Sequence, residues 1–146
     1  MSQAGSVEGI TLVLDSTGAT RQVEAVTAEA GRGLDGDYHS DLTLIAAEAL
    51  DGLREDTGIE LSGEQSRRNL LTRGIDLNAL VGRRFTVGGV EALGLELAEP
   101  CTKLQRISGE AGVLRGLVHR GGLRADVVSG GRISVGDEVG EQGPGR

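Results

Sequence analysis

The sequence predicts a mainly β fold of the α+β class, a barrel-like domain with two or three short helices. Glycine accounts for 25 of the 146 residues and divides the chain into short segments. Several segments have the alternating apolar period of a half-buried strand, as at Leu93, Leu95 and Leu97. Few segments have helical spacing. Many short strands with few helices are typical of barrels and sandwiches.

The N-terminal half is expected to contribute two strands, a loop and the clearest helix. Residues 10–14 and 22–26 are rich in β-branched and aliphatic residues, and residues 31–39 contain three glycines without an apolar period. From Asp41 onward, apolar residues recur at helical spacing, and Ser40 or Asp41 is available as the N-cap. We therefore predict a helix that begins at Asp41.

The C-terminal half is expected to be strands and hairpins with two short helices. A single domain over residues 1–140 with a disordered tail over 141–146 accounts for the whole pattern. In chain order, the predicted segments are a strand at 69–72, a short helix at 76–81 capped by Asp76 and stopped by Gly82, a hairpin of 84–87 and 90–93 around Gly88-Gly89, a helical stripe at 113–118, and a second hairpin of 125–128 and 132–135 around Ser129-Gly130-Gly131.

Composition argues against two classes of partner. No stretch approaches the roughly 20 apolar residues of a membrane span, and the N-terminus lacks a basic patch followed by an apolar run. A net charge of -7 repels phosphate backbones, and an aromatic content of 1% leaves little for bases to stack on. We expect a cytoplasmic protein that binds neither nucleic acid nor membranes.

Positive charge is concentrated in the C-terminal part of the chain. Residues 1–64 carry thirteen acidic and three basic residues, whereas residues 65–146 carry nine acidic and twelve basic residues. An anionic ligand would find its partners in this second part, although each arginine taken alone also fits an ordinary solvated side chain. The candidates are Arg67, Arg68, Lys103, Arg106, Arg115, Arg120 and Arg124.

Cys101, the only cysteine, is the best candidate for a reactive atom. It follows Pro100, which has no N–H for a sheet ladder and therefore suggests that the chain leaves its sheet here. Lys103, the only lysine, lies two residues further on, and a nearby cation favours the thiolate, the form that attacks electrophiles and binds metals. The alternative interpretation is that Cys101 is a small buried apolar residue.

The two histidines are too far apart in sequence to suggest a metal pair. His39 lies in the glycine-rich loop, where a structural role competes with orienting a cofactor or carrying a proton. Asp35 and Asp37 lack the spacing of a calcium loop, so we interpret them as turn residues that bond to local N–H groups. His119 has no assigned role.

The order of these motifs resembles the MOSC domain, which is named for the C-terminal part of molybdenum cofactor sulfurases. The resemblance runs from about residue 23 to residue 139. It rests on Gly33-Leu34-Asp35-Gly36-Asp37-Tyr38-His39, Ser66-Arg67-Arg68-Asn69-Leu70, Gly74-Ile75-Asp76-Leu77, Val81-Gly82-Arg83-Arg84-Phe85, Glu99-Pro100-Cys101, Gly121-Gly122-Leu123-Arg124-Ala125 and Gly136-Asp137-Glu138-Val139.

The resemblance implies a β-barrel that binds the molybdenum cofactor (molybdopterin). Cys101 would be the catalytic residue and the ligand of molybdenum or sulfur. Arg67, Arg68 and Asn69 would reach the cofactor, with Lys103 as an addition. Thiolate sulfur is a soft metal ligand, and arginine matches phosphate oxygens bidentately, so these residue types suit the ligand.

Two functions remain open at this stage. The first is a cofactor-binding or sulfur-carrier domain that uses a single reactive cysteine. The alternative is a molybdenum-cofactor-dependent oxidoreductase that reduces N-hydroxylated small molecules. The corresponding partners would be cofactor-donor proteins for the first function and separate electron-transfer proteins for the second. A purely structural β-domain with a buried Cys101 is the third interpretation.

Overall fold

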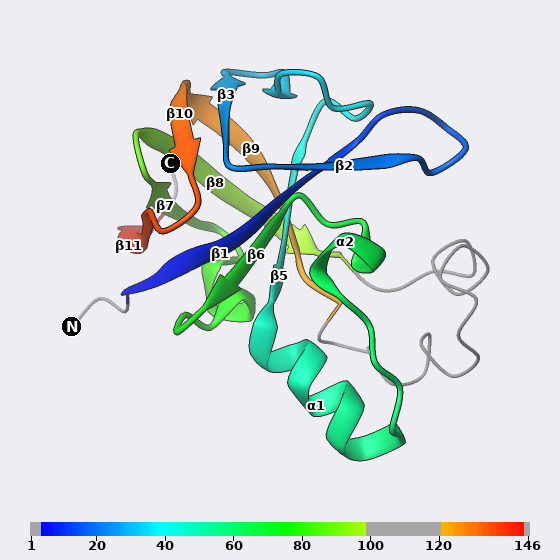
Figure 1. The fold of residues 1–146 in the computed structure, drawn as a ribbon. Coiled ribbons are helices and arrows are strands. Elements are labelled where there is room, and N and C mark those ends of the chain that lie inside the picture. The colour runs from blue at the N-terminus through cyan, green and yellow to red at the C-terminus, as the bar shows by residue number, and fades with distance from the viewer. Residues whose placement is uncertain (1–3, 99–120, 145–146) are drawn as a thin grey trace.

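A computed structural model describes residues 4–98 and 121–144 (Figure 1). Strands dominate these residues, with one helix of eleven residues and two single-turn helices. The elements are β1 Ala4–Val13, β2 Thr20–Val23, β3 Ala25–Glu29, β4 Gly33–Leu34, β5 Leu42–Ala46, α1 Ala47–Thr57, α2 Gly63–Ser66, β6 Leu70–Arg73, the 3-10 helix η1 Leu77–Leu80, β7 Arg83–Val87, β8 Val90–Leu97, β9 Leu123–Ser129, β10 Gly131–Ser134 and β11 Glu138–Pro144.

Seven strands close into a barrel. Their order is β11-β7-β8-β9-β5-β6-β1, and pairing of β11 with β1 completes the ring. Strand β2 is added outside β1, and β10, β3 and β4 form a separate small sheet. Strands β5 and β6 run parallel, while the other described neighbours in the barrel are antiparallel. The prediction of a mainly β, barrel-like fold is confirmed.

The barrel interior holds the main hydrophobic core. Alternate residues of β7 and β8 point inward, and Phe85, Val87 and Ala92 are fully buried. Leu42, Leu44 and other aliphatic side chains complete this core. A smaller cluster under α1 contains Ile45, Leu50, Leu53 and Leu61, so successive residues of β5 serve the two cores.

The predicted helix at Asp41 begins six residues too early. Residues Leu42–Ala46 form strand β5, and α1 starts at Ala47 without a side-chain N-cap from Ser40 or Asp41. Strand β5 lies between β6 and β9 and is buried on both faces. A short strand with both faces buried carries a continuous apolar run, which periodicity cannot distinguish from the first turn of a helix.

The hairpin around Gly88-Gly89 is confirmed, but the one around Ser129-Gly130-Gly131 is wrong. Strand β9 pairs with β8 and β5, whereas β10 leaves the barrel and pairs with β3. A Cβ at Gly130 would lie 2.6 Å from the carbonyl oxygen of Ala28. The glycine therefore permits a close backbone crossing between two sheets rather than a tight turn.

The disordered tail predicted for residues 141–146 is wrong for residues 141–144, which belong to strand β11. Strand β11 continues to Pro144, and Glu141 and Pro144 pair with Phe85 and Arg83 of β7. The short helix at 76–81 is confirmed as η1, with Asp76 as N-cap accepting from the Asn78 N–H. The helical stripe at 113–118 lies outside the described residues.

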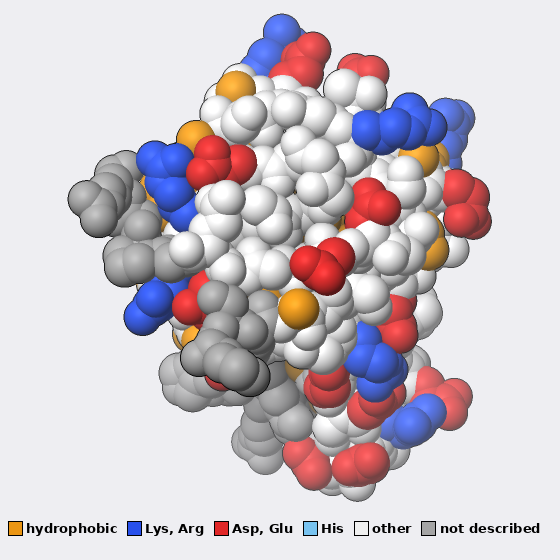
Figure 2. All heavy atoms as spheres, turned by 90° about the vertical axis from the view of Figure 1, so that its left-hand side faces the viewer, with side chains coloured by type: hydrophobic (Ala, Val, Ile, Leu, Met, Phe, Trp, Pro, Cys, Tyr) orange, Lys and Arg blue, Asp and Glu red, His pale blue; other side chains and the backbone are white. Residues whose placement is uncertain are grey.

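The described surface mixes charges of both signs. On the face in Figure 2, acidic and basic side chains are interspersed and hydrophobic side chains appear as scattered spots. In the described ranges, no helix combines the length and the apolarity needed to cross a membrane.

Candidate functional site

The predicted site residues Arg67, Arg68 and Asn69 form the turn between α2 and β6. Helix α2, which precedes the turn, begins with a capping box, in which Ser62 Oγ accepts from the Gln65 N–H and the Gln65 side chain accepts from the Ser62 N–H. Arg67 then adopts left-handed backbone angles, φ 63° and ψ 16°. It is the only non-glycine residue with positive φ in the described chain.

Arg67 carries a buried polar atom without a partner. Its Nη2 is inaccessible to solvent and makes no hydrogen bond within the part of the chain that the structure describes. Burial lowers the pKa of Arg67, and the nearby carboxylates of Glu64 and Asp15 oppose this shift. Arginine stays protonated even so, because its guanidinium is not deprotonated in proteins. The structure thus holds a partly buried cation with one donor atom that has no partner among the described residues.

Arg68 joins the two ends of the described chain that flank residues 99–120. Its Nε donates to the Gly121 carbonyl at 2.8 Å, and its Nη2 donates to the Ala98 carbonyl at 2.9 Å. The Ala98 N–H also donates to the Gly122 carbonyl at 2.8 Å. A planar guanidinium with fixed donor directions can bridge two carbonyls in this way, which a lysine cannot reproduce.

We expect Arg68→Lys to loosen this bridge. Loss of two charge-assisted hydrogen bonds to partly buried carbonyls should lower stability by about 1.5–3 kcal/mol. Thermal denaturation measures the loss, and amide hydrogen exchange at Ala98 and Gly121 locates it. Arg84→Lys is the matched control, because Arg84 Nη1 pairs with Glu91 on a neighbouring strand of the barrel. Equal protection of Ala98 and Gly121 in Arg68→Lys and the parent would contradict the bridging role.

The side chain of Asn69 is buried and connects β1, β5 and the loop before β5 through hydrogen bonds. Its side chain is 3% exposed. Oδ1 accepts from the backbone N–H and the hydroxyl of Thr43, at 3.1 and 3.2 Å, and Nδ2 donates to the Thr11 carbonyl and to Asp37 Oδ1, both at 3.0 Å. The Asn69 side-chain amide therefore donates both of its Nδ2 protons and accepts two hydrogen bonds at Oδ1.

Sequence reasoning treated Asp37 as a local turn residue and missed its long-range role. The local part is confirmed, because Oδ2 accepts from the His39 N–H at 3.1 Å. Oδ1 also accepts from the Val13 N–H at 2.7 Å and from Asn69. The side chain is fully buried. The sequence Asp35-Gly36-Asp37 contains no pattern that would predict hydrogen bonds from Asp37 to residues 24 and 32 positions away.

Cys101 and Lys103 lie outside the described residues, as does His119. Their predicted roles stay predictions, and so does the convergence of the Arg67-Arg68-Asn69 turn on Cys101. Among the described residues there is no group of three or more His, Cys, Asp and Glu side chains able to hold a metal ion.

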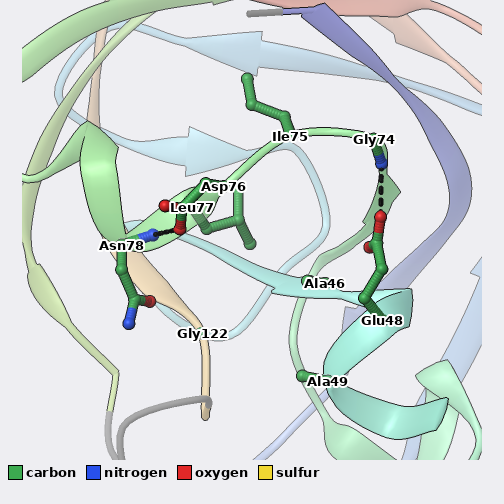
Figure 3. A pocket seen from close by; sticks show the side chains of 9 residues that line it. All are labelled: Ala46, Glu48, Ala49, Gly74, Ile75, Asp76, Leu77, Asn78 and Gly122. Carbon is green, nitrogen blue, oxygen red and sulfur yellow. Dashed lines mark hydrogen bonds between the residues drawn. The ribbon is translucent and has the colours of Figure 1, made fainter. Parts of the chain in front are cut away.

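A cavity of about 550 Å³ opens between the start of α1, the segment 74–78 and Gly122 (Figure 3). Glu48 Oε2 accepts from the Gly74 N–H at 2.7 Å, and Asp76 Oδ1 accepts from the Asn78 N–H at 3.1 Å. Ala46, at the far end of β5 from Thr43, also lines the cavity. Both carboxylates therefore hold backbone that shapes the wall.

Comparison with known proteins identifies the class to which this fold belongs. The model of the MOSC domain matches residues 31–140, and the chain belongs to that family. The YuaD protein from Bacillus subtilis is similar in structure, with a TM-score of 0.86, 17% identity and coverage of 98% of both chains.

Two YiiM structures are also similar. YiiM from Geobacillus stearothermophilus has a TM-score of 0.74 and 12% identity, covering 94% of this chain and 75% of that one. YiiM from Escherichia coli has a TM-score of 0.71 and 17% identity, covering 97% and 70%. At these identities the likeness establishes the fold alone. A comparison with curated protein sequences found no match.

Proposed function

We propose that this chain binds the molybdenum cofactor, with the cofactor's phosphate held at Arg67 and its molybdenum or sulfur at Cys101. The family is associated with that cofactor in general. The observation that carries the proposal for this chain is the buried Nη2 of Arg67, which has no hydrogen-bond partner among residues 4–98 and 121–144. A buried donor without an acceptor costs about 1–3 kcal/mol, more when charged, and a phosphate oxygen would remove that cost.

The backbone at Arg67 supports a selected role for its side chain. The position is the C-cap of α2 in the left-handed conformation, where glycine is the usual residue. Glycine occupies the corresponding C-cap of α1, at Gly58 with φ 76°. Keeping arginine at such a position is costly by about 1 kcal/mol or more, so its side chain has a use that offsets the backbone strain.

The other two residues of the turn are assigned positioning roles. Arg68 joins Ala98 to Gly121, and Ala98 precedes Cys101 by three residues. Asn69 fixes the start of β6 against Thr43 and Thr11. In this arrangement Arg67 contacts the anion, while Arg68 and Asn69 hold the backbone from which the contact is made. Lys103, which follows Cys101 by two residues in the sequence, would add positive charge to the site.

Cys101 is assigned the metal or sulfur ligand because a thiolate is the soft donor that a thiophilic metal prefers. When bound, the cofactor supplies a molybdenum centre for sulfur or redox chemistry. We favour a cofactor-binding or sulfur-carrier role, and partner proteins that donate cofactor or sulfur follow from it. The thiol would hold the sulfur or metal, and the arginine would retain the organic part through its phosphate.

We expect the purified protein to carry molybdenum and pterin when it is produced in a host that makes the cofactor. Metal analysis and the fluorescence of the oxidised pterin measure the two contents independently. Protein from a cofactor-deficient host is the control. Protein from the competent host that contains neither group, together with a failure to take up added cofactor, would overturn the proposal. Reduction of an N-hydroxylated compound by the loaded protein with a chemical reductant would instead support the oxidoreductase.

A further inference from the structure

The cavity in Figure 3 adjoins the bridge that Arg68 makes. Gly122 lines the cavity, and its carbonyl accepts from the Ala98 N–H at 2.8 Å. The neighbouring Gly121 carbonyl accepts from Arg68 Nε, also at 2.8 Å. A ligand in the cavity would therefore lie beside an end of the described chain that flanks the segment containing Cys101.

The cavity has the size and the mixed lining of a small-molecule site. Its volume of about 550 Å³ falls within the range of about 300–1,000 Å³ that is typical of ligand pockets. Ala46, Ala49 and Leu77 supply apolar wall, and in the view of Figure 3 the Leu77 side chain lies between the carboxylates of Glu48 and Asp76. A ligand with an apolar body and a polar head would contact both kinds of surface.

The charge of the wall is negative. Glu48 and Asp76 line the cavity, whereas no lysine or arginine is among the described residues that do so. Arg73, at the end of β6, instead pairs with Glu8 and Asp51, at 2.9 and 3.2 Å. The N-terminus of α1 acts in the opposite sense, but it is equivalent to only about half a positive charge against two carboxylates. The net potential of the described wall therefore favours a cation.

Backbone hydrogen bonds hold both carboxylates in position. Glu48 Oε2 accepts from the Gly74 N–H, and Asp76 Oδ1 accepts from the Asn78 N–H. An ionised carboxylate offers about four lone-pair sites, so Glu48 can accept from a ligand as well. The head group that suits this surface is an ammonium, which has three donors and a positive charge.

We propose that this cavity binds a small organic cation, in which an ammonium group lies between Glu48 and Asp76 and an apolar body packs against Ala46 and Leu77. The site goes beyond the proposed function, because Arg67 does not line the cavity and the ligand has the opposite charge. Its ligand is therefore additional to the anion proposed at Arg67.

Benzylammonium is the probe, and benzyl alcohol is its uncharged analogue of nearly the same shape. Each is titrated into the apo protein at neutral pH and followed by amide NMR. Saturable shifts should appear at Glu48, Gly74 and Asn78, and benzylammonium should bind about tenfold more tightly than benzyl alcohol, because each exposed charge pair contributes up to about 1 kcal/mol. Equal affinities for the two probes, or no saturable shift at these amides, would overturn the inference.

Glu48→Gln and Asp76→Asn test the two carboxylates. Each variant keeps a side-chain oxygen for the backbone N–H and removes one charge, so each should weaken benzylammonium binding by about threefold to fivefold and leave benzyl alcohol unaffected. Glu55→Gln is the matched control, because Glu55 lies on α1 but does not line the cavity. Parent affinity in both cavity variants would also contradict the inference. The test needs neither cofactor nor Arg67, so its failure would leave the proposed function standing.

Discussion

Arg67→Gly is expected to stabilise the protein while removing its ligand. The substitution relieves a left-handed arginine backbone at φ 63° and deletes the buried Nη2, which lacks a partner in the part of the chain that the structure describes. Relief of these two costs raises the free energy of unfolding. Lost packing and the greater freedom of glycine in the unfolded chain offset part of this, so the net gain in the free energy of unfolding should be about 1 kcal/mol. For a domain of this size that gain corresponds to a Tm rise of roughly 3–5 °C. Cofactor and sulfate should no longer be retained.

Gly58→Arg is the matched control for the backbone part of this effect. Gly58 is the C-cap of α1 at φ 76°, and a Cβ there would meet no atom of the described residues within 4 Å. An arginine at this open position should therefore cost about 1 kcal/mol through backbone conformation alone, without affecting the ligand. Thermal denaturation of both variants measures the pair of effects. A lowered Tm in Arg67→Gly with unchanged cofactor content would mean that Arg67 is a structural residue.

Cys101→Ser is expected to lose the bound metal or sulfur without loss of the fold. Serine nearly preserves the volume of cysteine but replaces the soft sulfur ligand with a hard hydroxyl. We expect molybdenum or persulfide content to fall more than tenfold, while Tm stays within about 2 °C of the parent. Metal analysis and persulfide labelling, run beside thermal denaturation, measure the two properties on the same preparation.

The opposite pattern would show that Cys101 is only a core residue. A buried apolar cysteine replaced by serine would place an extra hydroxyl in the core and lower Tm by several degrees. If that loss occurs while metal and sulfur contents are unchanged, the role of the thiol in the site must be withdrawn. Arg67→Gly then still tests the anionic end of the ligand independently.

The sequence predicted the fold class because glycine and strand alternation are local signals. The hairpin at Gly88-Gly89 and the cap at Asp76 depend on neighbours in the chain, and both are present. The errors occurred where distant neighbours decide. Strand β5 resembled the start of α1 because burial on both faces hides its period, and Gly130 resembled a turn because its close contact is with Ala28.

The site could be predicted only in part for the same reason. The basic residues of the turn at 67–69 are visible in the sequence, but the sequence does not show which of them bonds to the backbone and which has a donor without a partner among the described residues. Arg68 reaches backbone carbonyls 30 and 53 residues away, and Asn69 bonds to Thr11 and Asp37. The pattern Ser62-x-x-Gln65 does predict the start of a helix just before Arg67. It could have directed attention to the backbone of this residue.

Competition between sulfate and the cofactor tests the central claim most directly. Apo protein is titrated with molybdenum cofactor, followed by pterin fluorescence, in the absence and presence of saturating sulfate. If the cofactor's phosphate occupies the Arg67 site, sulfate should weaken cofactor binding in the parent in proportion to its own affinity and should have no effect on Arg67→Ala. Tight cofactor binding that sulfate does not weaken, and that Arg67→Ala retains, would contradict the account.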